Sequence, residues 1–182
     1  MKLLVISSSL NPDSKSRVLA KNAWEALEDK GHTVDWIDLR DFELPICGDS
    51  ESFGHEHVEE IGARIREAEG VLLAAPIHNY DVAASAKNLA EITSQSWHGK
   101  VVGLLVASGG HLSYMSPFHF MTSLMMHNRC VIVPRYVFAA GPQFSEEGDI
   151  LDPNVTERIE QLADTLIDFT GGLTGIASKL KG

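Results

Sequence analysis

The stretch that decides the fold is VLLAAPIHNYDVAASAKNLAEITSQSWHGKVVGLLVASGG, residues 71–110. It contains two short apolar runs, 71–75 and 101–107, of the kind that form strands buried on both faces of a sheet. The segment between them, roughly 83–97, is predicted to be helical. This order of strand, helix and strand is compatible with two parallel strands joined by a right-handed crossover.

The same alternation continues on both sides of this unit. The sequence predicts further strands at 2–7, 32–38 and 130–138, the last one bent near Pro134. It also predicts further helices at 16–30, at 117–128, along the apolar stripe Val58, Ile61, Ile65 and Ala68, and from Pro153 onward behind an Asp152 cap. Five strands alternating with five helices predict a doubly wound α/β sheet with helices on both faces.

Composition limits the class of protein. The 182 residues, 44% hydrophobic and 22% charged, suit a single domain over 1–182. No apolar run approaches the ~18 residues that cross a bilayer, and no secretory segment is recognisable, so we expect a cytoplasmic protein. A net charge of −10 argues against nucleic acid and anionic membranes as partners. Cys47 and Cys130 lack metal-ligand spacing and are expected to be reduced thiols.

In a doubly wound sheet, ligands bind at the carboxyl ends of the strands, which directs attention to three loops. The first, SSSLNPDSKSR (7–17), matches neither GxGxxG nor a P-loop. It is a hydroxyl-rich turn into a helix N-terminus, where unpaired N–H groups, serine hydroxyls and the charges of Lys15 and Arg17 would suit a phosphate monoester. The alternative is that Ser14 or Ser16 only caps the helix.

The other two loops follow the strands of the central unit. APIHNYDVAASAKNLAEI (75–92) offers polar and aromatic groups at a strand end, followed by small residues that permit close approach of a flat ligand. In VASGGHLSYM (106–115), paired glycines let backbone amides come near a ligand. For the second loop alone, ordinary exposed loop residues are the preferred interpretation, and for the third a tight turn without a ligand explains the glycines equally well. The three together fall where the fold predicts a site.

Taken together, SSSLNPDSKSR, PIHNYDVAASAKNLAEI and ASGG resemble the NAD(P)H-dependent FMN reductase family of flavodoxin-like proteins. PQFSEEGDILDPNVTERIEQL (142–162) is similar to the family's segment before its last helix. The resemblance runs from Lys2 to about Thr170 and leaves the tail 171–182 outside. It implies a flavodoxin-like three-layer sandwich whose five-stranded parallel sheet has the order 2-1-3-4-5.

The resemblance also implies noncovalent FMN at the strand ends, with NADPH or NADH as cosubstrate. The FMN phosphate would lie among residues of the first loop: Ser9, Ser14, Ser16 and Arg17. The isoalloxazine would lie along the second loop (Pro76, Ile77, His78, Asn79 and Tyr80) and be closed on its other side by Ser108, Gly109 and Gly110. His78 stands where the family has a tyrosine, Ala86 where it has a leucine, and Asn11-Pro12-Asp13 where an arginine is common.

Two functions follow. The first is an oxidoreductase that passes hydride from NAD(P)H to FMN and then to a small acceptor such as a flavin, quinone, chromate or azo compound. The cofactor carries this chemistry, so no catalytic side chain is predicted. The alternative is a flavin-binding electron carrier or regulatory protein. The small residues of the loops favour the enzyme, because they leave one flavin face open.

Two further features have competing interpretations. Six residues give an unusually apolar segment that suits either core packing or the face of a homodimer or homotetramer: Met115, Phe118, Phe120, Met121, Met125 and Met126. Oligomers are common in the resembled family, which favours the interface. His55 and His57 suggest a metal site, but an acid-rich, solvated helix start is the preferred interpretation and no metal is predicted.

Overall fold

A computed structural model describes residues 1–173 of the chain. Its parallel sheet contains β2 (Thr33–Asp38), β1 (Lys2–Ser7), β3 (Gly70–His78) and β5 (Val101–Ser108), hydrogen-bonded in that order. Two short strands, β6 (Val131–Ile132) and β7 (Val137–Ala140), both pair with β5 in parallel. With β6 and β7 counted as two halves of one strand, the predicted order 2-1-3-4-5 is confirmed.

Over residues 1–173, the sheet has seven strands rather than the predicted five. The predicted strand 130–138 is divided because Pro134 has no N–H to donate and Arg135 adopts a left-handed backbone, with φ of 60°. The other additional strand is β4 (Asp81–Val82), which runs antiparallel to the end of β3. Neither change alters the arrangement of the parallel strands.

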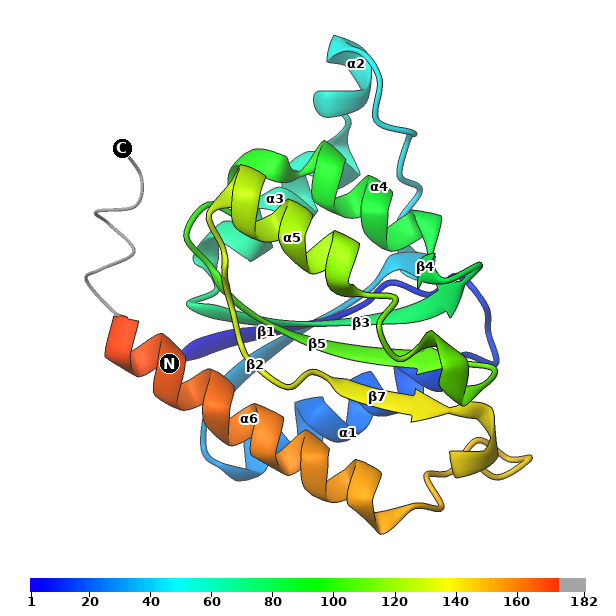
Figure 1. Ribbon diagram of the computed structural model, residues 1–182. Helices are drawn as coiled ribbons and strands as arrows, with labels where there is room; N and C mark the ends of the chain where they lie inside the picture. Colours follow the sequence, from blue (N-terminus) through cyan, green and yellow to red (C-terminus); the bar gives the residue numbers. More distant parts are fainter. Residues whose placement is uncertain (174–182) are drawn as a thin grey trace.

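Helices cover both faces of the sheet, giving the three layers seen in Figure 1. One face carries α3 (Glu56–Glu67), α4 (Ala84–Ile92) and α5 (Phe118–Asn128), and the other carries α1 (Lys15–Asp29) and α6 (Pro153–Leu173). The helix predicted over 83–97 is shorter, because α4 ends at Ile92 and a 3-10 turn, Ser94–Ser96, follows. The remaining pieces are short: the helix α2 (Ser50–Phe53) and the 3-10 turns Leu39–Asp41, His111–Ser113 and Gly141–Gln143.

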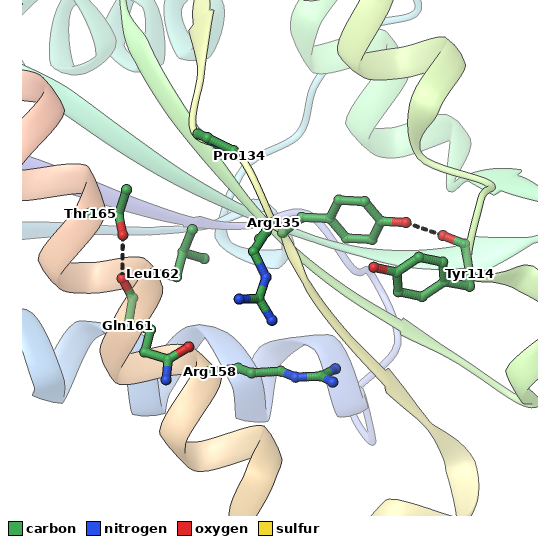
Figure 2. A pocket seen from close by; sticks show the side chains of 8 residues that line it. Tyr114, Pro134, Arg135, Arg158, Gln161, Leu162 and Thr165 are labelled. Atoms are coloured by element: carbon green, nitrogen blue, oxygen red, sulfur yellow. Dashed lines mark hydrogen bonds between the residues drawn. The ribbon is translucent and has the colours of Figure 1, made fainter.

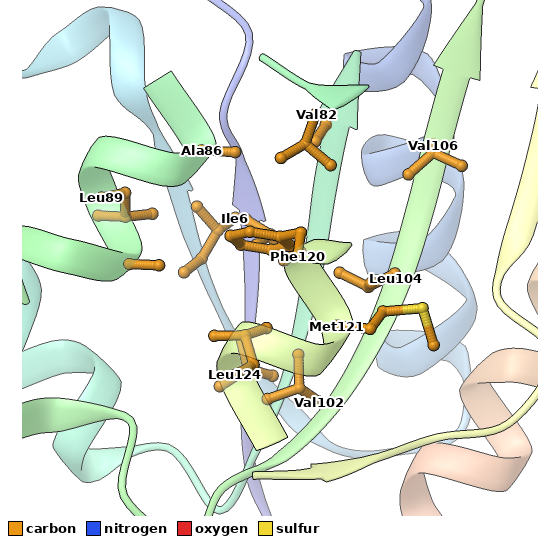
Figure 3. Close-up of a cluster of buried hydrophobic side chains, with 14 of the residues drawn as sticks. Ile6, Val82, Ala86, Leu89, Val102, Leu104, Val106, Phe120, Met121 and Leu124 are labelled. Carbon is orange, nitrogen blue, oxygen red and sulfur yellow. The ribbon is translucent and has the colours of Figure 1, made fainter. Parts of the chain in front are cut away.

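The core consists of two apolar clusters, one on each side of the sheet. Side chains alternate along β1, so that Leu4 and Ile6 belong to one cluster while Leu3 and Val5 belong to the other. Figure 3 shows Phe120 of α5 packed over the sheet beside Ile6. Full burial of one such large apolar side chain contributes roughly 1.5–3 kcal/mol. These clusters fix the sheet on which the loops stand.

The register of the sheet brings three loops together. Ser7 at the end of β1 pairs with Ala74 of β3, and Pro76 of β3 pairs with Ala107 of β5. The carboxyl ends of these strands therefore lie side by side at one edge. Within residues 1–173, no helix has the length and apolar character needed to cross a membrane.

Candidate functional site at the carboxyl edge of the sheet

The first loop ends at a capped helix N-terminus. Ser14 is the N-cap of α1, and its Oγ accepts a hydrogen bond from the Arg17 N–H at 3.3 Å. The same Oγ lies 2.9 Å from Ser16 Oγ. The capping interpretation is therefore correct for Ser14. The Ser14 cap does not exclude an anion, because the other amides in the first turn of a helix have no intrahelical acceptor and remain able to bind one.

Arg17 holds the first loop from behind. Its Nε donates to Asp38 Oδ2 at 2.7 Å, and Nη2 donates to Asp38 Oδ1 at 3.3 Å and to the Ser9 carbonyl at 2.8 Å. Nη1 donates to the carbonyls of Asn11 and Pro12 at 2.8 and 3.1 Å. All five N–H groups of the guanidinium thus have acceptors within the protein. This differs from the direct phosphate contact implied by the resemblance.

The serines of the first loop connect it to the neighbouring strand and helix. The Ser8 N–H and Oγ both donate to the Ala74 carbonyl, at 2.9 and 2.8 Å, and Ser85 Oγ donates to the Ser8 carbonyl at 2.6 Å. The Ser9 Oγ accepts from the Asn11 N–H at 3.3 Å. The Ser7 hydroxyl is buried and has no hydrogen-bond partner among residues 1–173. An unpaired buried hydroxyl beneath a serine-rich loop is a group that a bound phosphorylated ligand would satisfy.

The second loop is a tight β-hairpin. His78 pairs with Asp81 and Ile77 with Val82, so Asn79 and Tyr80 form a two-residue turn. Their φ values, 51° and 64°, are both in the left-handed region that a type I′ hairpin turn requires. The turn holds the Tyr80 side chain 65% exposed at the edge of the sheet. Ile77 differs from its neighbours, because its side chain is buried in the core.

The third loop contains two glycines whose positions the packing and backbone conformation of the protein would allow a larger residue to occupy. A Cβ added to Gly109 or Gly110 would meet no atom within 4 Å, and neither glycine has a left-handed φ. The Ser108 hydroxyl donates to the Gly110 carbonyl and shapes this turn. Gly141, after β7, is different, because its Cβ would lie 2.8 Å from the Gly109 oxygen. The open space beside Gly109 and Gly110 is therefore available to a ligand.

The edge carries charges of both signs, because Asp13, Glu146 and Glu147 line the same pocket as Lys15. The Lys15 ammonium lies 5.6 Å from the centre of the Phe144 ring and 3.4 Å from the Gly141 carbonyl. Burial raises the pKa of the Asp38 carboxyl, but hydrogen bonds from Arg40 and Arg17 outweigh it, and the net pKa lies below its ordinary value. Asp38 thus stays ionised and matches Arg17, while Lys15 remains as a cation beside the helix start.

These contacts bring the predicted segments to one place. All twelve predicted residues lie at the carboxyl ends of β1, β3 and β5, in the loops that follow them or in the first turn of α1: Ser9, Ser14, Ser16, Arg17, Pro76, Ile77, His78, Asn79, Tyr80, Ser108, Gly109 and Gly110. The donors present are hydroxyls, helix amides and one lysine, a set that fits a phosphate. The glycine turn and the exposed hairpin fit a flat ligand beside it.

Other residues of the site escaped sequence reasoning. Ser85 was predicted only as one of the small residues of the second loop, and its hydrogen bond to the first loop was not; Gly141, which approaches the third loop closely, lies in no recognisable local motif. Asp38 had a clearer signal, since a carboxylate at the end of the adjacent predicted strand is well placed to pair with Arg17. The hairpin was also readable, because Asn at the first central position is a common signal for a type I′ turn.

His55 and His57 lie apart from this edge, at the start of α3. Their rings are in edge contact, 5.3 Å between centroids, and each Nδ1 accepts a backbone N–H, from His57 and Glu43 respectively. Over residues 1–173, no group of three His, Cys, Asp or Glu side chains is arranged to hold a metal ion. These histidines serve as a helix cap and its neighbour.

A parallel α/β sandwich with a phosphate-type loop after β1 and an open glycine turn after β5 defines the flavodoxin-like class of proteins. Comparison with known proteins names the family within that class. The family model for NADPH-dependent FMN reductase matches residues 1–144, and the chain belongs to this family.

Individual relatives agree with the family assignment. An NAD(P)H-dependent FAD/FMN reductase of Geobacillus thermodenitrificans is 27% identical over 90% of both chains. A probable NADPH:quinone oxidoreductase 2 of Oryza sativa subsp. japonica is 26% identical over 96% of this chain and 91% of its own. The solved structure of FerB, a flavoenzyme NAD(P)H:(acceptor) oxidoreductase from Paracoccus denitrificans, superposes with a TM-score of 0.77 at 19% identity, covering 94% and 97%.

Proposed function

We propose that the protein is an NAD(P)H-dependent FMN oxidoreductase that reduces a small acceptor, a quinone, free flavin or azo compound. The single observation that carries this proposal is the open space beside Gly109 and Gly110, next to a phosphate-type helix start. Family membership supports it, because the matched family is named for NADPH-dependent FMN reduction. Bound FMN supplies the redox chemistry, taking two electrons from NAD(P)H and passing them to the acceptor.

The residues of the first loop would bind the FMN phosphate. Ser9, Ser14 and Ser16 hydroxyls and the first-turn amides of α1 provide hydrogen-bond donors, and Lys15 provides positive charge. Arg17 is a positioning residue in this proposal, because its guanidinium is saturated by Asp38 and three loop carbonyls. It would fix the loop in the shape that the phosphate needs.

The other two loops would bind the ring system. Backbone groups of Ser108, Gly109 and Gly110 would approach one side, which glycine permits because it has no side chain in the way. Pro76, Ile77, His78, Asn79 and Tyr80 would contribute from the hairpin, Ile77 through its backbone because its side chain is buried. An aromatic residue held outward at Tyr80 would also shield the reacting face from water.

The test is the visible spectrum of the purified protein with FMN, followed under anaerobic conditions after NADPH or NADH is added. Bleaching by either nucleotide, followed by reoxidation with a quinone, is the expected result. The double substitution Ser14→Asp, Ser16→Asp sets two carboxylates against the phosphate and should abolish FMN binding. Circular dichroism of the same variant checks that it folds. A bound flavin that neither nucleotide reduces would favour an electron carrier or regulatory flavoprotein.

We infer that the protein forms a homodimer or homotetramer through the surface beside this site. Of the six apolar residues singled out in the sequence, Phe120 and Met121 are buried, whereas four are exposed: Met115 (62%), Phe118 (44%), Met125 (42%) and Met126 (79%). Leu112 (88%) and Tyr114 (46%), in the loop before α5, are exposed as well. Met125→Asp should release monomers in sedimentation, whereas the control Leu151→Asp, at an exposed leucine elsewhere, should not. An unchanged profile for both would contradict the inference.

We also propose that residues 1–182 form one domain and that the protein is cytoplasmic. Two free cysteines, Cys47 and Cys130, are consistent with a reducing compartment. Limited proteolysis yielding one resistant core, and cell fractionation with an enzyme assay, test the two statements separately.

A further inference from the structure

Besides the candidate site at the carboxyl edge, the protein has a pocket between α6 and the break that separates β6 from β7. It has a volume of about 340 Å³ and is shown in Figure 2. Its walls come from the break itself, from α6 and from the loop after β5: Pro134, Arg135, Tyr136, Arg158, Gln161, Leu162, Thr165 and Tyr114. This pocket shares none of the twelve residues assigned to the FMN site.

The break in the strand places Arg135 in this pocket. Between β6 and β7 the chain leaves β5, and Arg135 adopts a φ of 60°. That conformation is unfavourable for a residue with a long side chain, and glycine or asparagine is usual there. Figure 2 shows the Arg135 side chain extending from the break toward α6 and Arg158. The irregular backbone thus has a consequence: it directs a guanidinium into the pocket.

The charge of the pocket is opposite to that of the protein. Arg135 and Arg158 both line it, and none of the eight lining residues is a carboxylate. Among residues 1–173, neither guanidinium forms an ion pair or hydrogen bond with another side chain. On a chain of net charge −10, two exposed arginines that converge on a pocket without a carboxylate among its lining residues form a local positive site suited to an anion.

Two carboxylates at the start of α6, Asp152 and Glu157, have other hydrogen-bond partners. The pKa of Asp152 is lowered first by a hydrogen bond from Gln143 and then by Asn154, with Arg158 contributing last through its charge. Glu157 accepts from Gln161 Nε2 at 3.0 Å on the exposed side of α6. Asp152 thus acts on Arg158 from outside the pocket, and neither carboxylate is one of the lining residues.

The remaining polar groups of the pocket point to an anion as well. The Tyr136 hydroxyl donates to the Tyr114 carbonyl, and Thr165 Oγ1 donates to the Gln161 carbonyl at 2.6 Å. The charged donors left over are those of the two guanidiniums, whose planar fork matches phosphate oxygens, and the Tyr114 hydroxyl lines the same pocket. Tyr114, Pro134 and Leu162 add an apolar wall beside them, suited to the organic part of a phosphate ester.

We propose that this pocket is a binding site for the phosphate group of a small molecule of nucleotide size, held by Arg135 and Arg158. Tyr114 belongs to the loop that begins at Gly109, so the pocket and the FMN site are connected through one segment of chain. Two kinds of molecule could carry the phosphate group that this pocket binds. It belongs either to the adenosine half of the nicotinamide cosubstrate or to a separate phosphorylated ligand.

The test is isothermal titration at low ionic strength with two probes, inorganic phosphate and adenosine 2′,5′-bisphosphate. FMN is present in excess, so that any phosphate site in the first loop is filled. The variants are Arg158→Gln and Arg135→Asn, the latter chosen because asparagine tolerates the left-handed backbone. Lys2→Gln is the matched control, since it removes one exposed positive charge on β1.

The wild type should bind adenosine 2′,5′-bisphosphate saturably. Each arginine variant should lose about tenfold in affinity, the free energy of one charge-assisted hydrogen bond, and the double variant should lose binding. Lys2→Gln should bind like the wild type. The proposal is overturned if the wild type binds neither probe, or if the arginine variants bind as the wild type does. Binding of a probe at the first loop would persist in both arginine variants. A failure of the FMN assignment is therefore distinguished from a failure of the assignment of this pocket.

Steady-state kinetics then assigns the source of the phosphate. A KM for NADPH that rises in Arg158→Gln, with the KM for NADH unchanged, assigns the phosphate to the cosubstrate. Unchanged KM values together with weakened bisphosphate binding assign the pocket to a separate phosphorylated ligand.

Discussion

Arg17 and Asp38 form a buried ion pair between the first loop and the end of β2. The two side chains are 7% and 4% exposed, and Arg17 Nε lies 2.7 Å from Asp38 Oδ2. Arg40 donates to the same carboxylate from the exposed side, at 2.7 Å. Because the other N–H groups of Arg17 donate to loop carbonyls, this pair sets the shape of the loop proposed to hold the FMN phosphate.

Asp38→Asn should destabilise the protein by about 3 kcal/mol, because it leaves a buried guanidinium without a counter-charge. Urea denaturation followed by circular dichroism measures this change. Asp35→Asn is the matched control, since Asp35 pairs with Arg64 at 2.7 Å but is 48% exposed. That pair should contribute about 1 kcal/mol or less. Equal losses in the two variants would contradict the role assigned to Asp38.

The same carboxylate predicts how stability depends on pH. The pKa of Asp38 in the folded protein lies below its ordinary value, because hydrogen bonds from Arg40 and Arg17 outweigh the effect of burial. A lowered folded-state pKa means that the stabilisation is fully present above the unfolded value of about 3.9 and is lost as pH falls through the folded value. The difference in unfolding free energy between wild type and Asp38→Asn should therefore be constant from pH 7 to 5 and shrink below about pH 4. A difference that persists undiminished into that acid range would show that the carboxylate charge is not its cause.

Substitutions of the glycines in the third loop should change FMN affinity without changing the stability of the fold. Gly109→Ala and Gly110→Ala should leave the unfolding free energy within about 0.5 kcal/mol of wild type, because the added Cβ meets nothing within 4 Å. FMN affinity, measured by quenching of flavin fluorescence, should fall about tenfold in at least one of them, since the methyl group enters the proposed ring site.

Gly141→Ala provides the contrast for these glycines. Its Cβ would lie 2.8 Å from the Gly109 backbone oxygen, so the loop must move and stability should fall by about 1–3 kcal/mol. If all three alanine variants bound FMN like the wild type, the ring would not lie at this turn.

The parallel strands were predictable because burial on both faces leaves a clear trace in the sequence. The runs at 2–7, 71–75 and 101–107 are nearly uninterrupted apolar residues, and each became a strand of the sheet interior. The carboxyl-edge location of the candidate site then followed from the fold rule for such sheets. The pattern of apolar residues thus predicted the doubly wound sheet, whereas the strand order 2-1-3-4-5 came from the family resemblance.

What could not be predicted depends on contacts between distant residues or on backbone conformation. Nothing near Arg17 in the sequence shows that its guanidinium turns toward Asp38, because this contact arises from the parallel pairing of β1 and β2. The predicted strand 130–138 contains Pro134, which suggested a bend. The left-handed Arg135 that completes the division into β6 and β7 leaves no signal of its own.

The Asn79–Tyr80 turn leads to a prediction with opposite signs for two substitutions. Tyr80 has a φ of 64°, which costs a side-chain-bearing residue roughly 1–2 kcal/mol, whereas glycine is free of that cost but loses about 0.5–1 kcal/mol in backbone entropy. Tyr80→Gly should therefore leave the protein as stable as wild type or slightly more stable. Tyr80→Val should destabilise it, because a β-branched residue fits this backbone poorly. Thermal unfolding of the two variants measures the difference.

If the exposed tyrosine ring also covers the reacting face, both variants should raise the KM for a quinone, even though one of them is fully stable. A stable Tyr80→Gly variant with wild-type kinetics would assign the ring no part in turnover and leave the turn with a purely structural role.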